Sequence, residues 1–555
     1  MNIVLVAINA KYIHSNLAVY SLRAYAKAYE EDISIAEYTI NQHTDDILRD
    51  LYKKKPDMLC FSCYIWNLNY VEELIREARK LFPNISIWVG GPEVTYDSKD
   101  VLERLPELTG VMFGEGEETF SELLEYYHGE PKGLSDIHGI AYRNEERQLC
   151  VNNWREPMDL NKVPFVYHDL TDFQNKIIYY ESSRGCPFSC SYCLSSVDKH
   201  LRFRDVETVK QEVQFFIDHE VPQVKFVDRT FNCNHAHAIA IWQYMKDHDK
   251  GITNFHFEIS ADLLNEEELE LLQSMRPGLV QLEIGVQSTN PDTIREIRRT
   301  MKFSEVARIV KRINQKQNIH QHLDLIAGLP YEDLESFKQS FNDVYELHPE
   351  QLQLGFLKVL KGSRMEKQKE AYELMYKSSP PYEVLSTKWL SYEDVLALKS
   401  VENMVEIYYN SGQFSYTLRR LEREFGSPYE LYESLGRYYE RKGLHLLNHS
   451  RIARYEILLD FIREHTGKAQ ELYRELLTFD LYLRENVKNR PTFAGEYRVS
   501  KEMKKQYGKE VHLEKFFYDV AGSWKKKEQI FLFDYEKRSK MNRQASCKIV
   551  SEEVK

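Results

Sequence analysis

Short apolar runs alternate with amphipathic stretches along the start of the chain. Residues 1–7 form one apolar run, and a helical pattern of apolar positions follows at about residues 17–29. Further short apolar runs occupy residues 33–38, 58–64, 85–89 and 110–113. Short apolar strands that alternate with helices are typical of a parallel sheet with both faces covered. We therefore predict a doubly wound, Rossmann-like α/β domain over residues 1–135.

The segment after this domain has a different pattern. Residues 139–143 and 148–152 flank a polar turn, which predicts a hairpin. The prolines that follow, with no clear periodicity, indicate a linker. We assign the hairpin and the linker to residues 136–172.

The alternation of strand and helix patterns then resumes over residues 173–370. The candidate strands are residues 177–181, 223–228, 254–260, 280–285, 320–327 and 351–357, and a helical pattern follows each of the first five. Six such units fit an incomplete (βα)6 barrel better than a closed eightfold one.

Helical periodicity dominates the remainder of the chain. We predict a mainly helical domain over residues 371–537, with two late strands at residues 511–519 and 530–534. The polar segment 538–555 is predicted to be a disordered tail.

Composition limits the function. The net charge is 74 − 86 = −12 at pH 7, which argues against a nucleic-acid partner because phosphate binding needs a basic surface. Eight cysteines in 555 residues are too few for a disulfide scaffold, and no apolar run approaches the roughly 20 residues of a membrane span. Since no signal peptide is recognisable either, we predict a cytoplasmic protein whose clustered thiols bind metal or act in catalysis.

Three of the eight cysteines lie together, in the segment Ser183-Arg-Gly-Cys186-Pro-Phe-Ser-Cys190-Ser-Tyr-Cys193. The segment follows the first predicted barrel strand, and loops after strands form the active face of βα barrels. Three thiolates could bind zinc with a distant histidine or a water molecule as fourth ligand, or an iron–sulfur cluster that keeps one iron open. Zinc sites favour pairs of C-x2-C, so the C-x3-C-x2-C spacing favours the cluster over zinc.

This spacing resembles that of the radical S-adenosylmethionine (SAM) enzymes. The resemblance implies a [4Fe-4S] cluster on the three cysteines, whose open iron binds the amino and carboxylate groups of SAM. It also implies that Tyr192, the aromatic residue before the last cysteine, contacts the adenine. Segments 226–232, 257–260, 282–288, 324–330 and 354–362 resemble, in order, the second to sixth strands of the family. The resemblance makes polar residues of three of these strands candidates for SAM contacts: Asp228, Glu258, Ser260, Glu283 and Gln287.

The first domain resembles the cobalamin-binding domain that precedes the barrel in one large class of radical SAM proteins. Ser62 ends the third predicted strand, Gly90 and Gly91 follow the fourth, and a Gly-Glu-Gly-Glu turn follows the fifth. Open parallel sheets bind ligands at such strand ends, and glycine lets the backbone approach a nucleotide tail closely. Many cobalamin domains carry a cobalt-binding histidine within Asp-x-His-x-x-Gly. His14 lacks the flanking Asp and Gly, so we expect cobalamin without a histidine ligand, and His14 as a polar loop residue.

The other cysteines carry weaker signals. Cys60 and Cys63 form a C-x2-C pair, but they lie in an apolar run whose alternation places them on opposite faces of the sheet, which favours core packing over a redox pair. Cys233 lies in a predicted turn on the active face and is interpreted as a spare thiol. Cys150 and Cys547 indicate nothing specific.

The resemblance covers the first two domains and implies a mechanism. A reduced cluster cleaves SAM to methionine and a 5′-deoxyadenosyl radical, the radical abstracts hydrogen from an unactivated position, and methylcobalamin could then deliver a methyl group. We therefore predict an enzyme that methylates a small organic substrate and receives electrons from a partner such as flavodoxin or ferredoxin. The C-terminal domain resembles one of unassigned function found on some of these proteins.

Three alternatives remain open. Within the class, the enzyme could be a radical cyclase or rearrangement enzyme, like the anaerobic cyclase that acts on chlorophyll precursors. A radical tRNA-modifying methylthiotransferase is disfavoured by the acidic charge and by the core interpretation of Cys60 and Cys63. A cobalamin or cluster sensor is the non-enzymatic alternative, and SAM cleavage would distinguish it from the enzymes.

Overall fold

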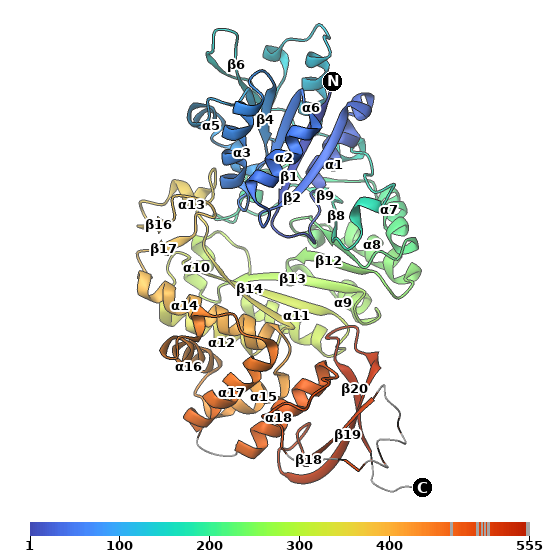
Figure 1. Ribbon diagram of the computed structural model, residues 1–555, viewed down its shortest axis with the longest axis vertical. Helices are drawn as coiled ribbons and strands as arrows, with labels where there is room; N and C mark the ends of the chain where they lie inside the picture. The colour runs from blue at the N-terminus through green and yellow to red at the C-terminus, as the bar shows by residue number, and fades with distance from the viewer. Residues whose placement is uncertain (467–469, 496–498, 501–502, 504–506, 508–510, 551–555) are drawn as a thin grey trace.

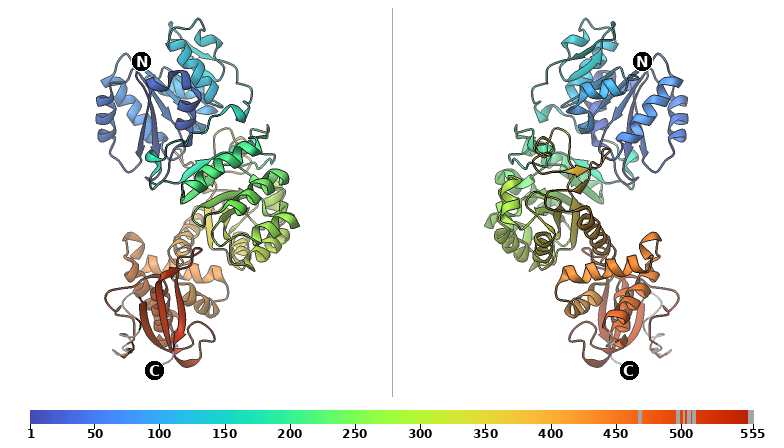
Figure 2. Two further views of the ribbon diagram at one scale, coloured as in Figure 1. Left: turned by 90° about the vertical axis from the view of Figure 1, so that its right-hand side faces the viewer. Right: turned by 90° about the vertical axis from the view of Figure 1, so that its left-hand side faces the viewer.

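The computed structural model describes residues 1–550 except 467–469, 496–498, 501–502, 504–506 and 508–510. Figure 1 shows three parts stacked along the long axis: an N-terminal α/β part, a central barrel part, and a C-terminal part of helices with a small sheet. The side views in Figure 2 show the same order. The three parts have the classes predicted for the N-terminal domain, the barrel and the C-terminal domain.

A seven-stranded sheet forms the centre of the N-terminal part, in the order β2-β1-β3-β4-β5-β6-β7. Its strands are β1 (Ile3–Asn9), β2 (Ile33–Thr39), β3 (Met58–Ser62), β4 (Ser86–Gly90), β5 (Gly110–Met112), β6 (Ile140–Arg143) and β7 (Leu149–Val151). The first five pair in parallel, and the hairpin β6–β7 continues the sheet in antiparallel fashion from β5. The hairpin exists as predicted, but it extends the sheet of the first domain and is not part of the linker.

Helices cover both faces of this sheet. They are α1 (Leu17–Tyr25), α2 (Thr44–Lys54), α3 (Leu68–Leu81), α4 (Pro92–Thr95), α5 (Ser98–Arg104) and α6 (Glu117–Tyr127). Alternate residues of β1 enter different cores: Leu5 packs in the cluster that contains Phe120 of α6, and Val6 packs in the cluster that contains Leu74 of α3. Because successive side chains of a strand point to opposite faces, this is the doubly wound arrangement that was predicted.

Six parallel strands form the central part, in the order β15-β14-β13-β12-β11-β8. They are β8 (Ile178–Tyr180), β11 (Gln223–Phe226), β12 (Asn254–Ile259), β13 (Val280–Gln287), β14 (His320–Ala327) and β15 (Gln351–Phe356). The helices α7 (Val206–Asp218), α8 (His235–His248), α9 (Glu266–Gln273), α10 (Pro291–Glu296), α11 (Phe303–Asn314) and α12 (Leu334–Tyr345) lie between them in the chain. Among the described residues the end strands β8 and β15 do not pair, so the barrel is incomplete, as predicted.

Strict alternation along the barrel strands separates an apolar from a polar face. In β13, Leu282, Ile284 and Val286 are buried in the main core, whereas Glu283 and Gln287 line a cavity on the other side. The convex face thus packs against the helices, and the concave face presents polar side chains.

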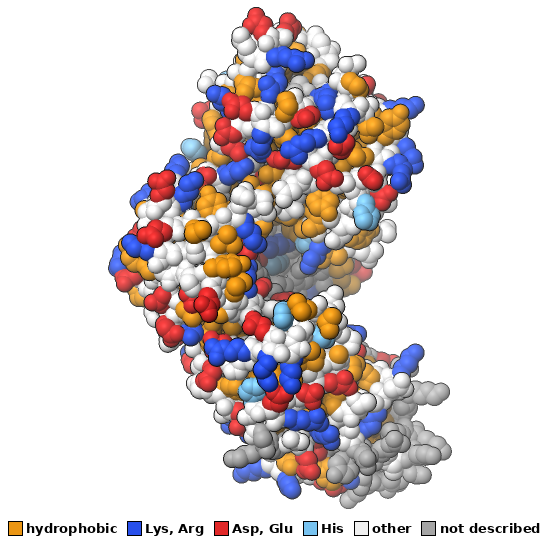
Figure 3. All heavy atoms as spheres, turned by 60° about the vertical axis from the view of Figure 1, so that its left-hand side comes forward, with side chains coloured by type: hydrophobic (Ala, Val, Ile, Leu, Met, Phe, Trp, Pro, Cys, Tyr) orange, Lys and Arg blue, Asp and Glu red, His pale blue; other side chains and the backbone are white. Residues whose placement is uncertain are grey.

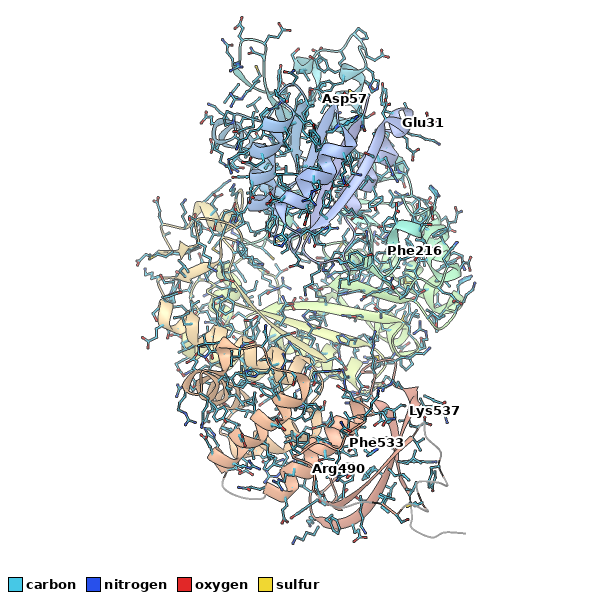
Figure 4. The ribbon with its side chains drawn as sticks, viewed as in Figure 1. Glu31, Asp57, Phe216, Arg490, Phe533 and Lys537 are labelled. Carbon is cyan, nitrogen blue, oxygen red and sulfur yellow. The ribbon has the colours of Figure 1, made fainter. Side chains whose placement is uncertain are left out.

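The C-terminal part packs helices on a small antiparallel sheet. A short helix α13 (Arg364–Lys367) and the strand pair β16 (Met375–Tyr376) and β17 (Val384–Ser386) lead into it. Its helices are α14 (Tyr392–Met404), α15 (Ser415–Leu421), α16 (Pro428–Arg441), α17 (Arg451–Thr466) and α18 (Gln470–Arg484). The tyrosines are largely core residues, as predicted; the hydroxyls of buried Tyr408 and Tyr439, for example, lie 2.7 Å apart. Phe533 packs its ring 5.6 Å from that of Phe479 on α18 (Figure 4).

The end of the chain corrects one prediction. Strands β18 (Val511–Tyr518) and β19 (Lys526–Arg538) were expected, but the segment 538–555 was predicted to be disordered. The structure shows β20 (Ala545–Val550) paired with β19, while residues 551–555 lie outside the described residues. Since only Ala545 is buried in this edge strand, backbone pairing rather than an apolar pattern defines it, and the sequence carries little signal for it.

Candidate active site

The cysteine segment forms a loop closed by a short antiparallel pair, β9 (Ser183–Arg184) with β10 (Arg202–Phe203). Gly185 begins the loop with a φ of +94°, and a Cβ there would lie 2.6 Å from the carbonyl oxygen of His200. Only glycine therefore allows the two sides of the loop to approach this closely. The loop leaves the carboxyl end of the first barrel strand, the position predicted for an active face.

All three loop cysteines line a single cavity. Cys186 and Cys190 are 8% and 7% exposed, and Cys193 is half-buried. The backbone of Ser191 fixes the loop between two distant segments: its N–H donates to the carbonyl of Ile297 at 2.9 Å, and its carbonyl accepts from the N–H of Met365 at 2.8 Å. Three thiols that line one cavity fit a [4Fe-4S] cluster with one open iron.

Arg299 supports this thiol site, and sequence reasoning missed it. Its Nη1 donates to Sγ of Cys190 at 3.8 Å, and its Nη2 donates to the carbonyl of Gly285 at the concave face of β13. A guanidinium beside a thiolate stabilises the negative charge that metal binding requires. Because Arg299 is 109 residues away from Cys190 in sequence, no local motif could have connected the two.

The structure brings most of the predicted SAM-contact residues to this cavity. The lining includes Tyr192, Glu258, Ser260, Glu283 and Gln287 beside the three cysteines. It also includes residues that were not proposed as site residues: Arg229, Thr230, Arg299 and Asp324. Thr230 lies next to the loop, with its Oγ1 4.0 Å from Sγ of Cys186.

Asp228 is the exception among the predicted residues, because it does not line the cavity. It is fully buried and accepts hydrogen bonds from the N–H and hydroxyl of Ser182 and from the hydroxyl of Ser183. Burial raises the pKa of Asp228 to about 6, and the serine hydrogen bonds act against this rise. Its position indicates that Asp228 holds the strand end from which the cysteine loop begins.

The cavity walls contain carboxyl groups with opposite pKa shifts. Burial raises the pKa of Glu258 to about 7, although the charge of Arg229 acts in the opposite direction. Burial also acts to raise the pKa of Glu283, but His256 and Lys225 outweigh it and hold that pKa well below its ordinary range. At neutral pH Glu283 is therefore anionic while Glu258 is partly protonated, so the wall offers both hydrogen-bond acceptors and a donor.

The predicted cobalamin-contact residues lie at adjacent strand ends of the N-terminal sheet. Ser62 ends β3, and its Oγ accepts from Nδ2 of Asn16 at 3.2 Å. Gly90 ends β4, and the three atoms nearest to a Cβ there would belong to Met112, at 3.5 Å or more. Gly91 has a φ of +116°, and a Cβ there would lie 2.5 Å from the carbonyl oxygen of Cys63. The fold itself thus requires Gly91, whereas a Cβ at Gly90 would fit in ordinary van der Waals contact, so the fold alone does not require glycine there.

The same strand ends face the barrel. His14, in the loop after β1, forms an isolated bridge with Ile177, and its Nδ1 lies 2.6 Å from the hydroxyl of Tyr179. Burial lowers the pKa of His14, and Lys11 lowers it further, so the imidazole is neutral. Tyr64, in the loop after β3, also lies near the barrel. Burial raises the pKa of Tyr64 to about 12, and the positive charge of Arg229 in the cavity wall acts to lower it. His14 is therefore a residue of the contact between the two domains.

The remaining cysteines occupy the places that their patterns predicted. Cys60 and Cys63 are both buried, but they belong to the cores on opposite faces of the N-terminal sheet. Burial raises the pKa of both thiols, which keeps them protonated and unreactive. Cys233 is half-buried near Cys186, and burial raises its pKa to about 11.

Comparison with protein families agrees with this arrangement. Residues 3–124 match the B12 binding domain family, and residues 180–344 match the Radical SAM superfamily. The chain therefore carries a B12-binding domain followed by a Radical SAM domain. These domains identify the cofactors as a [4Fe-4S] cluster, SAM and cobalamin, as predicted. Residues 370–530 match a further family, described as protein of unknown function (DUF4080).

Individual relatives are similar over part of their length. The 2-(S-pantetheinyl)-carbapenam-3-carboxylate methyltransferase of Streptantibioticus cattleyicolor is 26% identical over 311 residues, 52% of this chain and 45% of that enzyme. The anaerobic magnesium-protoporphyrin IX monomethyl ester cyclase of Synechocystis is 26% identical over 251 residues, 43% of this chain and 49% of that enzyme. The chain thus spans less than half the length of these two relatives.

A solved structure shows the same fold. The cobalamin-dependent S-adenosylmethionine radical enzyme OxsB, with aqua-cobalamin and S-adenosylmethionine bound, superposes with a TM-score of 0.60 at 17% sequence identity, over 86% of this chain and 78% of OxsB. Within the described part of the chain, no helix is both long and apolar enough to cross a membrane.

Proposed function

We propose that this protein is a cobalamin-dependent radical SAM methyltransferase that acts on a small organic substrate. The proposal rests on one observation: an ion pair joins the cysteine loop to the strand ends of the B12-binding domain. Arg184, two residues before Cys186, lies 2.8 Å from Glu117, which follows β5 of that domain. A methyl carrier held at those strand ends would face the cavity in which SAM is cleaved.

The two named relatives support a small-molecule substrate, since one is a methyltransferase of a carbapenam and the other a cyclase of a porphyrin ester. When bound, the cluster supplies the electron that cleaves SAM, and cobalamin supplies the methyl-group carrier. Within this proposal, Tyr192 contacts the adenine, and Glu258, Ser260 and Gln287 orient the rest of SAM. Arg299 holds the charge of Cys190, and Glu283 stays anionic at the cavity wall.

The proposal also includes the electron donor and the compartment. We infer that a donor such as flavodoxin or ferredoxin reduces the cluster, because SAM cleavage consumes an electron that the protein itself does not supply. All eight cysteines are unpaired, as expected for a protein of the reducing cytoplasm.

The test uses SAM labelled in its methyl group and the anaerobically reconstituted protein with cobalamin and a reductant. A methyltransferase passes the label to the product and forms S-adenosylhomocysteine alongside 5′-deoxyadenosine. Candidate substrates come from metabolites that accumulate in a strain lacking the gene. Label transferred to tRNA instead would support the RNA-modifying alternative.

The similarity to the Synechocystis cyclase favours a second candidate, radical cyclisation or rearrangement. In that case the true substrate is converted with formation of 5′-deoxyadenosine and methionine, and no label enters the product. The same experiment therefore separates the two candidates.

A further inference from the structure

The concave face of the barrel carries more polar side chains than a SAM site alone explains. Strand register places them in rows across β11 to β14: Lys225, His256, Gln281 and His320 in one row, and Glu258, Glu283 and His322 in the next. Asp324 follows two residues further along β14. Figure 3 shows a hollow in the middle of the molecule with basic side chains at its floor. Glu258, Glu283 and Asp324 of these rows line the cavity that also contains the three cysteines.

Three of these side chains converge on one point. One ligand atom from each of Glu283, His322 and Asp324 lies within 4.8 Å of the other two. Adjacent strands β13 and β14 hold them, so the backbone fixes their spacing. Ligand atoms that share one metal ion at about 2.1 Å lie roughly 3 to 4 Å apart, which small side-chain rotations would achieve here.

Two of the converging atoms are buried without a hydrogen-bond partner. Nε2 of His322 and Oδ1 of Asp324 have none in the described part of the chain, and His322 is only 7% exposed as a whole residue. The two atoms lie 3.0 Å apart. Since buried polar atoms almost always have a partner, a cation between these atoms would satisfy both.

The basic side chains near these three residues contact Glu283 but not Asp324. Lys225 and His256 contact the same oxygen of Glu283, Oε2, at 2.9 and 3.0 Å. These two contacts orient the Glu283 carboxylate through one of its two oxygens. Among the described residues, no Lys or Arg lies within ion-pair distance of Asp324.

We propose that Glu283, His322 and Asp324 bind a divalent transition-metal ion at the floor of the cavity. One imidazole and two carboxylates suit Mn²⁺, Fe²⁺ or Zn²⁺. Three protein ligands leave coordination positions open, and Glu283 and Asp324 line the cavity. The ion can therefore anchor an oxygen or nitrogen donor of a substrate beside the SAM site. This site uses no thiol and does not depend on the proposed methyl transfer.

Manganese titration tests the site in the full-length protein reconstituted with its cluster, without SAM or cobalamin. Mn²⁺ is chosen because thiolates bind it weakly, and free Mn²⁺ is measured by electron paramagnetic resonance with the cluster in its oxidised, silent state. We expect about one Mn²⁺ per wild-type chain. His322→Ala and Asp324→Asn should each weaken binding at least tenfold, because each removes one of three ligands.

His320→Ala is the matched control, because His320 is the same residue type on the same strand and face, two positions before His322. This variant should bind Mn²⁺ like the wild type, and unchanged iron and sulfide content shows that each variant is folded around its cluster. Three outcomes overturn the site: no Mn²⁺ binding to the wild type, unchanged binding in both ligand variants, or an equal loss in His320→Ala. Because SAM and cobalamin are absent from the titration, failure of the methyl-transfer proposal leaves this result unaffected.

Discussion

Arg184 and Glu117 join the cysteine loop to the B12-binding domain by a direct ion pair, with Nη2 of Arg184 2.8 Å from Oε1 of Glu117. Glu117 begins α6 and is 6% exposed. Burial acts to raise the pKa of Glu117, but the charge and hydrogen bonds of Arg184 hold it below its ordinary value. The pair is thus a buried, charged contact that fixes one cofactor domain relative to the other.

Replacing Glu117 tests whether this contact aligns the two domains. Glu117→Gln removes one charge and should weaken the docking by about 1 to 3 kcal/mol. Methylated product should then fall roughly tenfold relative to 5′-deoxyadenosine, because SAM cleavage needs only the barrel. The measurement is the ratio of the two products under single-turnover conditions. Glu118→Gln is the control, since Glu118 is the next residue but pairs with Arg155. An unchanged ratio in Glu117→Gln would show that the domains align without the pair.

The cluster assignment predicts a sharp difference among neighbouring thiols. Cys186→Ala, Cys190→Ala and Cys193→Ala should each remove the [4Fe-4S] cluster and SAM cleavage together. Cys233→Ala should retain about four irons and full cleavage, although Cys186 lies close enough to Cys233 to raise the pKa of the Cys233 thiol. Iron and sulfide analysis with a 5′-deoxyadenosine assay measures both. Full cleavage by Cys193→Ala, or stoichiometric zinc without iron in the wild type, would falsify the assignment.

Arg299 should tune the cluster. A hydrogen bond from a charged donor is worth about 1.5 to 3 kcal/mol, so its loss from Cys190 disfavours the reduced, more negative cluster. Arg299→Met should therefore shift the midpoint potential to more negative values and slow SAM cleavage about tenfold or more with a fixed reductant. Potentiometric titration measures the shift, and Arg298→Met, an exposed neighbour, is the control. A cluster with unaltered potential in Arg299→Met would show that the contact has no electronic role.

The features that could be predicted from the sequence are those that depend on local patterns of residues. Alternating apolar runs located the strands of both sheets, and the cysteine spacing located the loop that the structure places at the cavity. The support of that loop could not be predicted in this way, because Arg299 reaches Cys190 through barrel packing over 109 residues. The convergence of Glu283 and His322 likewise depends on strand register, which a single strand pattern does not reveal.

Asp228 and Gly91 show a second limit of predicting cofactor contacts from the sequence. Both lie in motifs whose resemblance was interpreted as cofactor contact, but the structure gives each an internal cause. Asp228 caps the serines before the cysteine loop, and Gly91 passes too close to Cys63 for any Cβ. A residue type that a ligand would require can also be required by the fold, and only the three-dimensional contacts separate the two causes.

The neighbouring glycines therefore make a discriminating pair for cobalamin. Gly91→Ala should destabilise the domain by about 2 to 3 kcal/mol, because of its positive φ and the 2.5 Å approach to Cys63. Gly90→Ala should leave the melting temperature nearly unchanged, because its Cβ would be in ordinary contact with Met112, but weaken cobalamin binding, because the added methyl group would keep a nucleotide tail from the backbone at the strand end. Spectral titration with hydroxocobalamin measures the affinity. His14→Ala should leave the cobalt spectrum unchanged; a strong spectral shift would contradict binding without a histidine ligand.

The buried carboxyl group of Glu332, behind the cavity, should make the stability of the protein depend on pH. It is fully buried, and its Oε1 accepts hydrogen bonds from the hydroxyls of Ser288 at 2.6 Å and Ser340 at 2.9 Å. Ser288 directly follows the cavity residue Gln287. Burial raises the pKa of Glu332 to about 7, with the serine hydrogen bonds acting in the opposite direction. The folded protein thus retains a proton on Glu332 at pH values where the unfolded chain has lost it.

Stability should therefore fall as the pH rises from about 4.5, the ordinary pKa of Glu332, to about 7, its value in the fold. The loss attributable to this group is on the order of 3 kcal/mol. Glu332→Gln removes the titration, so the difference in melting temperature between variant and wild type should shift in favour of the variant between pH 5 and pH 8. Thermal denaturation of the holoprotein across this range measures it. Glu335→Gln is the control, because the Glu335 side chain is 80% exposed on the following helix. If the wild type and Glu332→Gln change in parallel with pH, Glu332 is ionised throughout and its burial does not shift its pKa.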